Sequence, residues 1–421
     1  MAKQQPSATQ TSVGAILVIN CGSSSVKFSL IQPESGTTLL SGLAECLLTP
    51  QACINIQCNI EIDDKKATET HALTAPYDHQ VALNSLVTML VQLNLVNNII
   101  AVGHRVVHGG EHYAQPTLID ANVKETIEKL AKLAPLHNPA NLIGINACQR
   151  VYLSLPQVAI FDTAFHQSMP EQAYLYGLPM ALYQEHAIRR YGFHGTSHYF
   201  VARETAKLIN KPLEQCHFIS AHLGNGCSVT VIKNGQSVDT SMGMTPLEGV
   251  MMGTRTGDID AGIIFHLVEQ VGYSIEQVEA LLNKKGGLLG LSGLSNDCRM
   301  LEAAMLDKNH PKSAHAQLAL TVFCYRIAKV IASFSASLKE LDALIFTGGI
   351  GENSAWVRKE IVDQLSLLNF QLCEERNQAT RFGKVGIITH STSRPCWVIA
   401  TNEEWVIAEQ SSQLLTSTSA S

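Results

Sequence analysis

Residues 18–30 read Val-Ile-Asn-Cys-Gly-Ser-Ser-Ser-Val-Lys-Phe-Ser-Leu, an apolar run interrupted by a Gly/Ser turn. The pattern predicts two strands joined by a tight hairpin. Small residues at 22–25 let backbone N–H groups and hydroxyls converge on an anion, which bulky side chains would prevent. With Asn20 at the strand end and Lys27 beyond the turn, the segment is typical of a phosphate-binding loop, although an ordinary polar β-turn uses the same small residues.

A strand, a glycine-rich turn and a second strand occur again at 217–233, where His-Leu-Gly-Asn-Gly-Cys-Ser (222–228) forms the turn. The residues alone do not align the two copies position by position. Recurrence of one unit roughly 200 residues later indicates a duplicated fold with a phosphate loop in each half. We expect the halves to face each other across a cleft.

Predicted strands and helices alternate along the whole chain, which is typical of an α/β protein. The expected strands are 14–20, 26–32, 98–103, 156–161, 217–223, 227–233, 342–347 and 396–401. The expected helices are 123–134, 198–210, 311–338 and 354–368. Apolar residues at three- and four-residue steps in the helix at 311–338 predict a stripe that faces a core.

The bulk composition is that of a globular chain large enough for two or three domains. The 421 residues are 46% hydrophobic and 16% charged, with a net charge of −6. Because the basic residues are scattered, neither nucleic acid nor an anionic membrane is the expected partner. An anionic substrate must then be held by a few local cations.

The eleven cysteines are an odd number and form no CxxC pair, which indicates reduced thiols and a cytoplasmic location. No signal sequence is expected, and no stretch approaches the roughly 20 apolar residues of a membrane span. The extension at 1–13 and the tail at 416–421 are predicted to be disordered.

A third glycine-rich turn, Phe-Thr-Gly-Gly-Ile-Gly-Glu-Asn at 346–353, follows one expected strand and opens a helix. Its bare backbone would let an anionic or flat group approach the helix N-terminus. It is not a GxGxxG motif, so a dinucleotide fold is disfavoured, and a simple capped loop is the alternative. Three such turns in one chain favour nucleotide binding.

Two arginines in glycine-flanked loops are candidate anion ligands. Arg105 lies in His-Arg-Val-Val-His-Gly-Gly (104–110), and Arg255 in Met-Gly-Thr-Arg-Thr-Gly-Asp (252–258). A planar guanidinium suits bidentate capture of carboxylate or phosphate. The HxxxH spacing at 104–108 is not a zinc site of the HExxH type, because Arg105 replaces the carboxylate. Four further candidates, each alternatively a structural histidine, are His137, His194, His198 and His222.

Candidate carboxylates follow expected strands, where side chains reach the ligand crevice of an α/β sheet. Asp162 follows the strand at 156–161, and Glu403 and Glu404 follow that at 396–401. Together with Asn20 they supply the carboxylate and amide oxygens that suit Mg²⁺.

The chain contains a series of longer motifs, which occur in this order: NCGSSSVKF, GHRVVHGG, LHNP, FDTAFH, YGFHGTSH, HLGNG, GMTPLEGVMMGTRTGDID, FTGGIGEN and TNEE. In these motifs the chain resembles the acetokinase family. That family belongs to the superfamily of acetate and sugar kinases, Hsp70 and actin. The resemblance covers residues 14–415 and implies a duplicated actin-like, ribonuclease H-like fold with the active site between two lobes. The lobes would be 14–162 plus 405–415, and 163–404, with homodimerisation through the second.

The resemblance implies reversible transfer of the ATP γ-phosphate to acetate with Mg²⁺, for which Mn²⁺ can substitute. The implied catalytic residues are Arg105, Asp162, His194 and Arg255, with metal ligands Asn20 and Glu403 and supporting residues His137 and His198. The implied acetate pocket is Arg105, Val107, Leu136, Phe193 and Pro246. The implied nucleotide site is Lys27, His222, Leu223, Gly224, Asn225, Gly226, Asp297, Cys298, Arg299, Gly349, Ile350, Gly351 and Asn353. The chain departs from the family pattern at Ala261 and Gly262, where Pro is common, and at Gly286, where Ser is usual.

An ionised carboxylate needs no general base, so we expect direct in-line transfer, with Asp162 orienting Arg105 or a metal-bound water. A covalent phospho-carboxylate route is the alternative mechanism. The alternative functions are a propionate or butyrate kinase and, in a different class, a nucleotide-gated binding protein of the Hsp70/actin type.

Overall fold

The computed structural model describes residues 14–59, 68–135 and 137–419. The chain divides into two compact units: unit 1 is Met1–Phe161 with Glu403–Ser421, and unit 2 is Asp162–Asn402. The sequence-based partition differs from this by one residue at the first boundary and two at the second, because it assigned Asp162 to the first lobe and residues 403–404 to the second.

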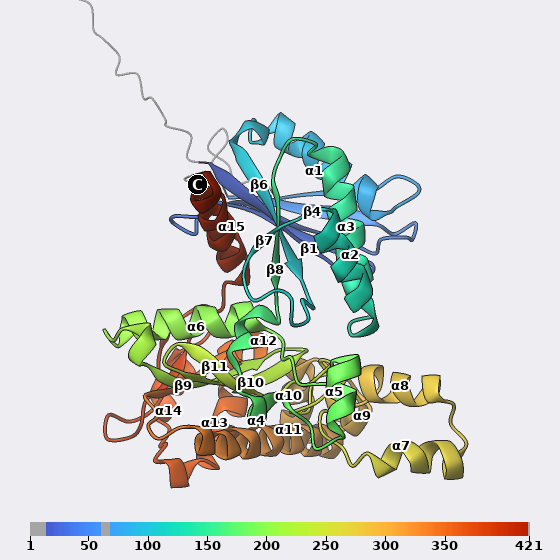
Figure 1. The fold of residues 1–421 in the computed structure, drawn as a ribbon. Helices are drawn as coiled ribbons and strands as arrows, with labels where there is room; N and C mark the ends of the chain where they lie inside the picture. Colours follow the sequence, from blue (N-terminus) through green and yellow to red (C-terminus); the bar gives the residue numbers. More distant parts are fainter. Residues whose placement is uncertain (1–13, 60–67, 136, 420–421) are drawn as a thin grey trace, which may run out of the picture. The chain divides into compact units, whose positions relative to one another are not determined.

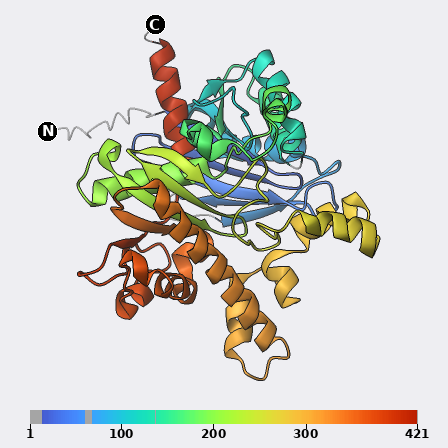
Figure 2. The same cartoon turned by 60° about the horizontal axis from the view of Figure 1, so that its bottom comes forward.

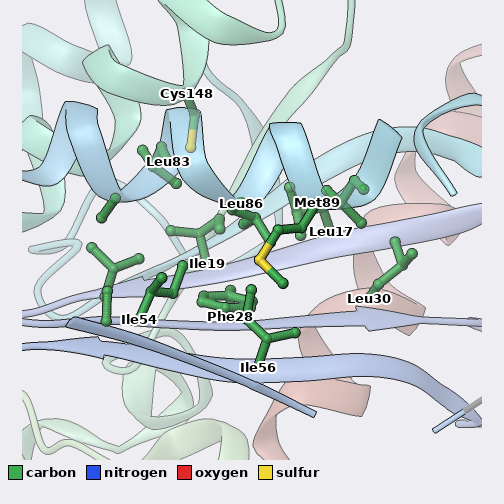
Figure 3. Close-up of a cluster of buried hydrophobic side chains, with 14 of the residues drawn as sticks. Leu17, Ile19, Phe28, Leu30, Ile54, Ile56, Leu83, Leu86, Met89 and Cys148 are labelled. Atoms are coloured by element: carbon green, nitrogen blue, oxygen red, sulfur yellow. The ribbon is translucent and has the colours of Figure 1, made fainter. Parts of the chain in front are cut away.

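Unit 1 contains an eight-stranded sheet in the order β5-β4-β3-β2-β1-β6-β8-β7. Its strands are β1 (Ala15–Cys21), β2 (Val26–Ile31), β3 (Thr38–Glu45), β4 (Cys53–Cys58), β5 (Thr68–Ala72), β6 (Ile99–Val106), β7 (Thr117–Leu118) and β8 (Gln157–Phe161). Alternate residues of β1 face opposite sides, as the pleat requires. Leu17 and Ile19 join the core under α1 (His79–Gln92) and α3 (Asn138–Val151), part of which Figure 3 shows. Ile16 and Val18 pack with Ile407 of α15 (Glu403–Ser419) on the other face (Figure 1).

Unit 2 contains a six-stranded sheet in the order β11-β10-β9-β12-β14-β13. Its strands are β9 (His217–Leu223), β10 (Cys227–Lys233), β11 (Gln236–Thr240), β12 (Ala343–Thr347), β13 (Gly386–Ile387) and β14 (Cys396–Val398). Helix α6 (Gly195–Leu208) covers one face, and α11 (Ser313–Phe334) covers the other (Figure 1). The sheet is therefore buried on both sides.

Five strands in each unit share one arrangement. The order β3-β2-β1-β6-β8 in unit 1 matches β11-β10-β9-β12-β14 in unit 2. In both, the first three strands are antiparallel and the last two run parallel to the third. Cys21 pairs with Val26 across a four-residue turn, whereas Leu223 pairs with Cys227 across a three-residue turn. The duplicated α/β fold is confirmed, and the unequal turns explain why the sequence alone gives no register.

The remaining helices connect these sheets or cover their edges. In unit 1 they are α2 (Ala121–Lys129) and the 3₁₀ turns Val96–Asn98 and Leu130–Lys132. In unit 2 the α-helices are α4 (Glu171–Tyr174), α5 (Met180–His186), α7 (Gly262–His266), α8 (Ile275–Lys284), α9 (Gly287–Ser292), α10 (Cys298–Leu306), α12 (Gly348–Asn353), α13 (Ala355–Asp363) and α14 (Glu374–Ala379). Unit 2 also has 3₁₀ turns at Ala164–Ser168, Leu213–Gln215, Ser335–Ser337 and Ser366–Leu368, and a π-helical turn at Leu267–Val271.

The predicted elements occur in the structure, but several of their ends differ, and the helices α1 and α3 were not predicted. The predicted helices at 123–134, 311–338 and 354–368 each end in a 3₁₀ turn, and α6 begins at Gly195 rather than at 198. Strand β14 stops at Val398, short of the predicted residue 401. Helix α15 continues to Ser419, whereas disorder was expected from residue 416. The strands β3, β4, β5, β7, β11 and β13 were not predicted; β5 is polar and exposed, whereas β3 and β4 bury apolar side chains that were not recognised as strand patterns.

Helix α11 and the 3₁₀ turn after it form the longest apolar helical segment of unit 2. Among the described residues, Ser313–Ser337 is long and apolar enough to cross a membrane by length and composition, with a mean hydropathy of 1.5. The expectation that no stretch approaches this length is therefore wrong. Phe323, Ile327 and Ile331 of this helix are fully buried within unit 2. Figure 2 shows α11 running through the unit, with residues near 270 (yellow) at one edge. One face of the helix is thus buried in unit 2, although 39% of the window as a whole is buried.

Candidate functional site

In unit 1 the β1–β2 hairpin lies against the start of α15. Asn20, at the end of β1, is opposite Lys27 of β2. Lys27 forms an ion pair with Glu404 at 2.5 Å, and the Ser29 hydroxyl donates to the same carboxylate at 3.0 Å. These contacts place Glu403, the first residue of α15, at the same edge as Asn20. They also show that the Lys27 ammonium is already paired with a carboxylate within its own unit.

The end of β6 is held by the first turn of α3. The Val107 and His108 N–H groups donate to the side-chain oxygens of Asn141 and Asn138, each at 3.1 Å. Asn141 also donates to the Cys21 carbonyl at 3.0 Å, which ties the end of β1 to the same helix. His137 is the N-cap residue of α3, and Arg105 is half-buried on β6. These bonds join the strand end that carries Arg105 and Val107 to the start of α3, where His137 lies. Leu136 lies outside the described residues.

Asp162, the first residue of unit 2, is buried beside the start of α6. Its carbonyl accepts a hydrogen bond from Gly195 N–H at 2.9 Å. A Cβ at position 195 would lie 2.4 Å from that carbonyl, so this approach requires glycine. The preceding residue, His194, has a left-handed backbone with φ 58° and directs the chain into α6. Asp162 and His194 are therefore neighbours through the backbone.

Three of the predicted histidines form a cluster on α6 and the β9–β10 hairpin. The His194 and His222 rings stack with centroids 4.3 Å apart. His194 Nδ1 lies 2.9 Å from the Ser228 hydroxyl, and His222 Nδ1 lies 2.8 Å from the Ser197 hydroxyl. His198 is fully buried between these elements, and desolvation together with His166 and His222 holds its pKa well below the usual value. His198 is therefore a neutral histidine at physiological pH.

Arg255 reaches the same hairpin from a loop that precedes α7. Its Nη1 donates to the Pro246 carbonyl at 3.0 Å. A Cβ at Gly226 would lie 3.4 Å from His194 Nε2 and 3.6 Å from Arg255 Nη1, so both groups flank that glycine. Burial lowers the Arg255 pKa, but a guanidinium stays charged at neutral pH. Gly226 thus lies between a fixed cation and an imidazole nitrogen.

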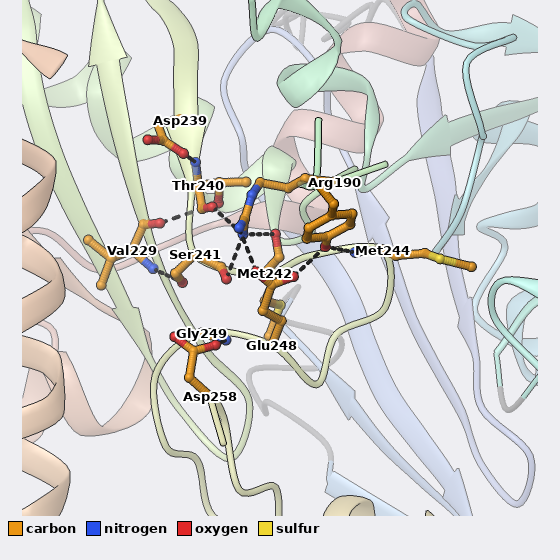
Figure 4. A network of polar contacts seen from close by, with 11 residues as sticks. Arg190, Val229, Asp239, Thr240, Ser241, Met242, Met244, Glu248, Gly249 and Asp258 are labelled. Atoms are coloured by element: carbon orange, nitrogen blue, oxygen red, sulfur yellow. Dashed lines mark hydrogen bonds and ion pairs between the residues drawn. The ribbon is translucent and has the colours of Figure 1, made fainter. Parts of the chain in front are cut away.

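A polar network fixes the loop that carries Pro246 (Figure 4). Arg190 donates to the carbonyls of Thr240, Ser241 and Met242 at 2.9, 3.0 and 3.2 Å. It also forms an ion pair with Glu248 at 2.5 Å, and Glu248 accepts a hydrogen bond from the Tyr176 hydroxyl. Burial and the Glu248 carboxylate raise the Tyr176 pKa, so this phenol stays protonated.

A cavity of ≈ 530 Å³ opens beside the β9–β10 turn in unit 2. Predicted nucleotide-site residues in its lining are Gly224, Asn225, Asp297, Cys298, Arg299, Gly349, Ile350 and Asn353. Gly348, with φ +75°, lets α12 approach β9, because a Cβ there would lie 2.8 Å from the Leu223 carbonyl oxygen. The predicted residues His222, Leu223, Gly226 and Gly351 are not in the lining, although they belong to the same turn and helix.

The cavity also contains residues that sequence reasoning missed: Asn296, Glu302, Ser354, Arg381 and Phe382. Phe382 is 77% exposed and has a left-handed backbone with φ 55°. Its N–H donates to the Asn353 side chain at 3.0 Å, and Arg381 Nε donates to the Asn353 carbonyl at 2.8 Å. The sequence offers no signal for these residues, because Arg381 and Phe382 reach the cavity through tertiary contacts with Asn353.

His166 was also missed as a site residue, although it stands in the quoted FDTAFH segment. Its ring nitrogens lie 2.8 Å from the Ser237 hydroxyl and 2.9 Å from the Phe193 carbonyl. Burial lowers its pKa to about 4. His166 therefore fixes the backbone of Phe193, which the family resemblance assigns to the acetate pocket.

The candidate ligands for a divalent metal are two side-chain oxygens, which by themselves do not form a complete coordination site. Among the described residues there is no group of three or more His, Cys, Asp or Glu side chains that would hold a metal ion. Asn20 and Glu403 offer one amide and one carboxylate oxygen at one edge of unit 1. That set fits Mg²⁺, which keeps several waters and takes its other ligands from substrate phosphates.

The duplicated fold, the cavity lined by glycine-rich turns and the arginine beside Gly226 define a nucleotide-dependent phosphotransferase. The family model described as the acetokinase family matches residues 15–409. An acetate kinase of Shewanella sp. (strain ANA-3) is 54% identical over 403 residues, covering 95% of this chain and 98% of the relative. The chain belongs to the acetokinase family, and it is a kinase with a carboxyl group as acceptor.

Solved structures agree with this assignment. A propionate kinase from Francisella tularensis has a TM-score of 0.88 at 41% identity, covering 94% of this chain and 98% of that one. The acetate kinase of Porphyromonas gingivalis has a TM-score of 0.86 at 37% identity, covering 96% and 99%. The two-lobed actin-like α/β architecture expected from the sequence is thereby confirmed.

Proposed function

We propose that this chain catalyses the reversible, Mg²⁺-dependent transfer of the ATP γ-phosphoryl group to acetate, giving acetyl phosphate and ADP. One observation carries the proposal: the turn at 224–226 lines the cavity with Gly224 and Asn225, and its last residue is flanked by Arg255 and His194. A nucleotide in the cavity would thus have its phosphates beside a guanidinium and an imidazole. Those groups are suited to the negative charge of a transferring phosphoryl group.

Unit 1 supplies the acid-binding residues of the proposal. Arg105 on β6 is a bidentate partner for a carboxylate, and Val107, 8% exposed, offers an apolar surface to a methyl group. The clamp formed by Asn138 and Asn141 fixes the backbone at this strand end. Phe193 and Pro246 of unit 2, and Leu136 outside the described residues, stay predicted acid-binding residues.

The acid attacks phosphorus directly, because a carboxylate with a pKa near 4 is already ionised at neutral pH. No side chain has to remove a proton, so Asp162 is not needed as a general base in this route. Arg255 and His194 hold the equatorial oxygens as charge develops on them. The test is transfer from ATP with a chiral γ-phosphorus. Inversion of configuration would support this direct route, and retention would instead indicate a phosphorylated carboxylate on the protein.

Asn20 and Glu403 are the proposed protein ligands of Mg²⁺, with Mn²⁺ able to replace it. A divalent cation held by these two side chains would supply positive charge to offset that of the phosphates. Asn20→Ala should raise the Mg²⁺ concentration needed for half-maximal turnover. Thr88→Ala, on the exposed side of α1, is the matched control and should leave that concentration unchanged.

We propose that the chain works as a cytoplasmic homodimer that associates through unit 2. All eleven cysteines are free thiols, as expected in a reducing compartment. Exposed apolar side chains gather on the segment from α7 to α8: Ile263, Phe265, Val271, Tyr273 and Ile275. Such a row is typical of an association surface. Light scattering should give twice the chain mass, and Phe265→Asp should give the single chain mass.

The test of function is an assay of acyl phosphate by hydroxylamine trapping, with ATP, Mg²⁺ and a panel of acetate, propionate and butyrate. We expect the highest kcat/KM with acetate, because Val107 narrows the pocket. The likeness to a propionate kinase makes propionate the second candidate substrate, and one methylene changes binding by only ~1–3 kcal/mol. Val107→Ala should shift the ratio towards propionate, whereas Val102→Ala in the core of β6 should not.

A higher kcat/KM with propionate or butyrate would contradict the acetate assignment but not the reaction. Absence of acid-dependent ADP formation with every acid would contradict the kinase itself. In that case a nucleotide-gated binding protein would be the remaining function.

A further inference from the structure

Ser228 links two histidines in the interior of unit 2. Its hydroxyl lies 2.9 Å from His194 Nδ1 and 2.7 Å from His198 Nε2. The other nitrogen of His198, Nδ1, lies 2.6 Å from the Ser220 hydroxyl. Ser220, His198 and Ser228 are each fully buried. Hydrogen bonds therefore run without interruption from Ser220 through His198 and Ser228 to His194.

The number of hydrogens available to this series of hydrogen bonds is fixed. A serine hydroxyl carries one hydrogen, and a neutral imidazole carries one N–H and one acceptor nitrogen. His198 is neutral, as its lowered pKa shows. If Ser228 donates to one histidine ring, it accepts from the other. The hydrogen bonds from Ser220 to His194 therefore have two complete arrangements. All donors point towards His194 in one and away from it in the other.

The proposed role of His194 selects one arrangement. A phosphoryl oxygen is an acceptor, so the ring nitrogen beside Gly226, Nε2, must carry the hydrogen. Nδ1 of a neutral His194 must then accept, and its donor is the Ser228 hydroxyl. Ser228 in turn accepts from His198 Nε2–H, and His198 Nδ1 accepts from Ser220. The choice at His194 thus determines every proton position back to Ser220.

We propose that Ser228, through His198 and Ser220, is a positioning residue that holds His194 as the Nε2–H tautomer, a hydrogen-bond donor to the transferring phosphoryl group. The inference rests on the proposed function. The stacked His222 ring, whose own Nδ1 is held by Ser197, restricts His194 from the other side. Ring orientation and proton position are therefore both set before the substrate binds.

The test is the tautomer of His194 in the full-length protein labelled with ¹⁵N-histidine. Long-range ¹H–¹⁵N correlation at neutral pH distinguishes a protonated from an unprotonated ring nitrogen, and the His194→Gln spectrum assigns the signals. The wild type should show Nε2–H. Ser228→Ala should give a mixture of tautomers and lower kcat roughly 10- to 100-fold, the range found when the partners that orient metal-ligating histidines are removed. The KM values for ATP and acetate should change little.

Ser220→Ala tests the end of the hydrogen-bond series that is farthest from His194. It should change the tautomer of His194 in the same direction as Ser228→Ala does. Thr205→Val is the matched control, because Thr205 is equally buried on α6 and its hydroxyl donates to the Val201 carbonyl rather than to a histidine. That control should leave the His194 signals and kcat unchanged.

Three results would overturn the proposal: Nδ1–H in the wild-type spectrum, an unchanged tautomer in Ser228→Ala, or an equal loss of kcat in Thr205→Val. The spectrum needs no turnover. A chain without acid-dependent activity that still shows the Nε2–H form would contradict the proposed function and leave the positioning intact.

Discussion

Arg255 donates a hydrogen bond to the Pro246 carbonyl, with 3.0 Å between Nη1 and the oxygen. The bond fixes a guanidinium that is partly buried, so the charge does not have to be reorganised when a phosphoryl group arrives. It also makes the position of Arg255 depend on the loop that contains Pro246. The chemistry of the site is thus coupled to the packing of that loop.

Replacing Arg255 by alanine should lower kcat by roughly 10³–10⁵-fold, because the charge that balances the transferring group is lost. This corresponds to about 4–7 kcal/mol of activation free energy. Steady-state kinetics of acyl phosphate formation measure the effect, with circular dichroism to verify folding. Arg326→Ala, on the exposed face of α11, is the control and should keep wild-type turnover. A folded Arg255→Ala protein with more than a tenth of wild-type turnover would contradict the role.

Glu248→Gln should disturb the Pro246 loop without removing a proposed substrate contact. The change weakens the ion pair with Arg190 and the hydrogen bond from Tyr176 (Figure 4). We expect a loss of about 1–3 kcal/mol in the free energy of unfolding, since hydrogen bonds to charged groups are of that order. kcat should fall by less than in Arg255→Ala. Urea titration and kinetics measure the two effects.

The same substitution at the exposed Glu279 of α8 controls for the change of charge and should alter neither quantity. If Glu248→Gln were as stable and as active as this control, the network would have no part in holding Arg255.

The fold is more accessible to sequence reasoning than the site. The two Gly-turn hairpins were predicted because a strand pattern around glycine and serine is local information. Phe382 and Arg381 reach the cavity only because Asn353 bonds to both residues. That contact joins segments almost thirty positions apart in the chain, and no periodicity records it.

For Lys27, the local sequence suggests one binding partner and the structure shows another. The sequence places it beside a phosphate loop, which suggests an anion ligand. The structure pairs it with Glu404, a residue brought in by the C-terminal helix. A local pattern identifies a residue type, but the partner that neutralises a charge comes from tertiary packing.

Phe382→Ala should weaken nucleotide binding. The ring is 77% exposed in a cavity wall, so it is available to stack on a base. Base–aromatic stacking contributes about 1–3 kcal/mol, which corresponds to a rise in the KM for ATP of roughly 5- to 150-fold. The KM for acetate should not change. Leu367→Ala removes a fully exposed apolar side chain away from the cavity and serves as the control. An unchanged KM for ATP in Phe382→Ala would place the base elsewhere.

Gly286, where the family resemblance leads us to expect Ser, is closely packed in this structure. A Cβ at this position would lie 2.6 Å from Cγ2 of Thr256, the residue after Arg255. The Gly286 N–H donates to the Thr254 carbonyl at 3.0 Å, so the backbone has little room to move away. Gly286→Ser should therefore destabilise the protein by about 1–3 kcal/mol, as other insertions into packed sites do. Thermal unfolding measures the loss.

Removing the methyl group of Thr256 should relieve the clash. We expect Gly286→Ser with Thr256→Ser to regain most of the stability that Gly286→Ser alone loses, because contacting residues are not additive. Gly177→Ser is the control, since nothing lies within 4 Å of a Cβ built there, and it should leave the midpoint of unfolding unchanged. Equal stability of Gly286→Ser and the wild type would show that the Arg255 loop adapts freely, which would also contradict the fixed position of Arg255 argued above.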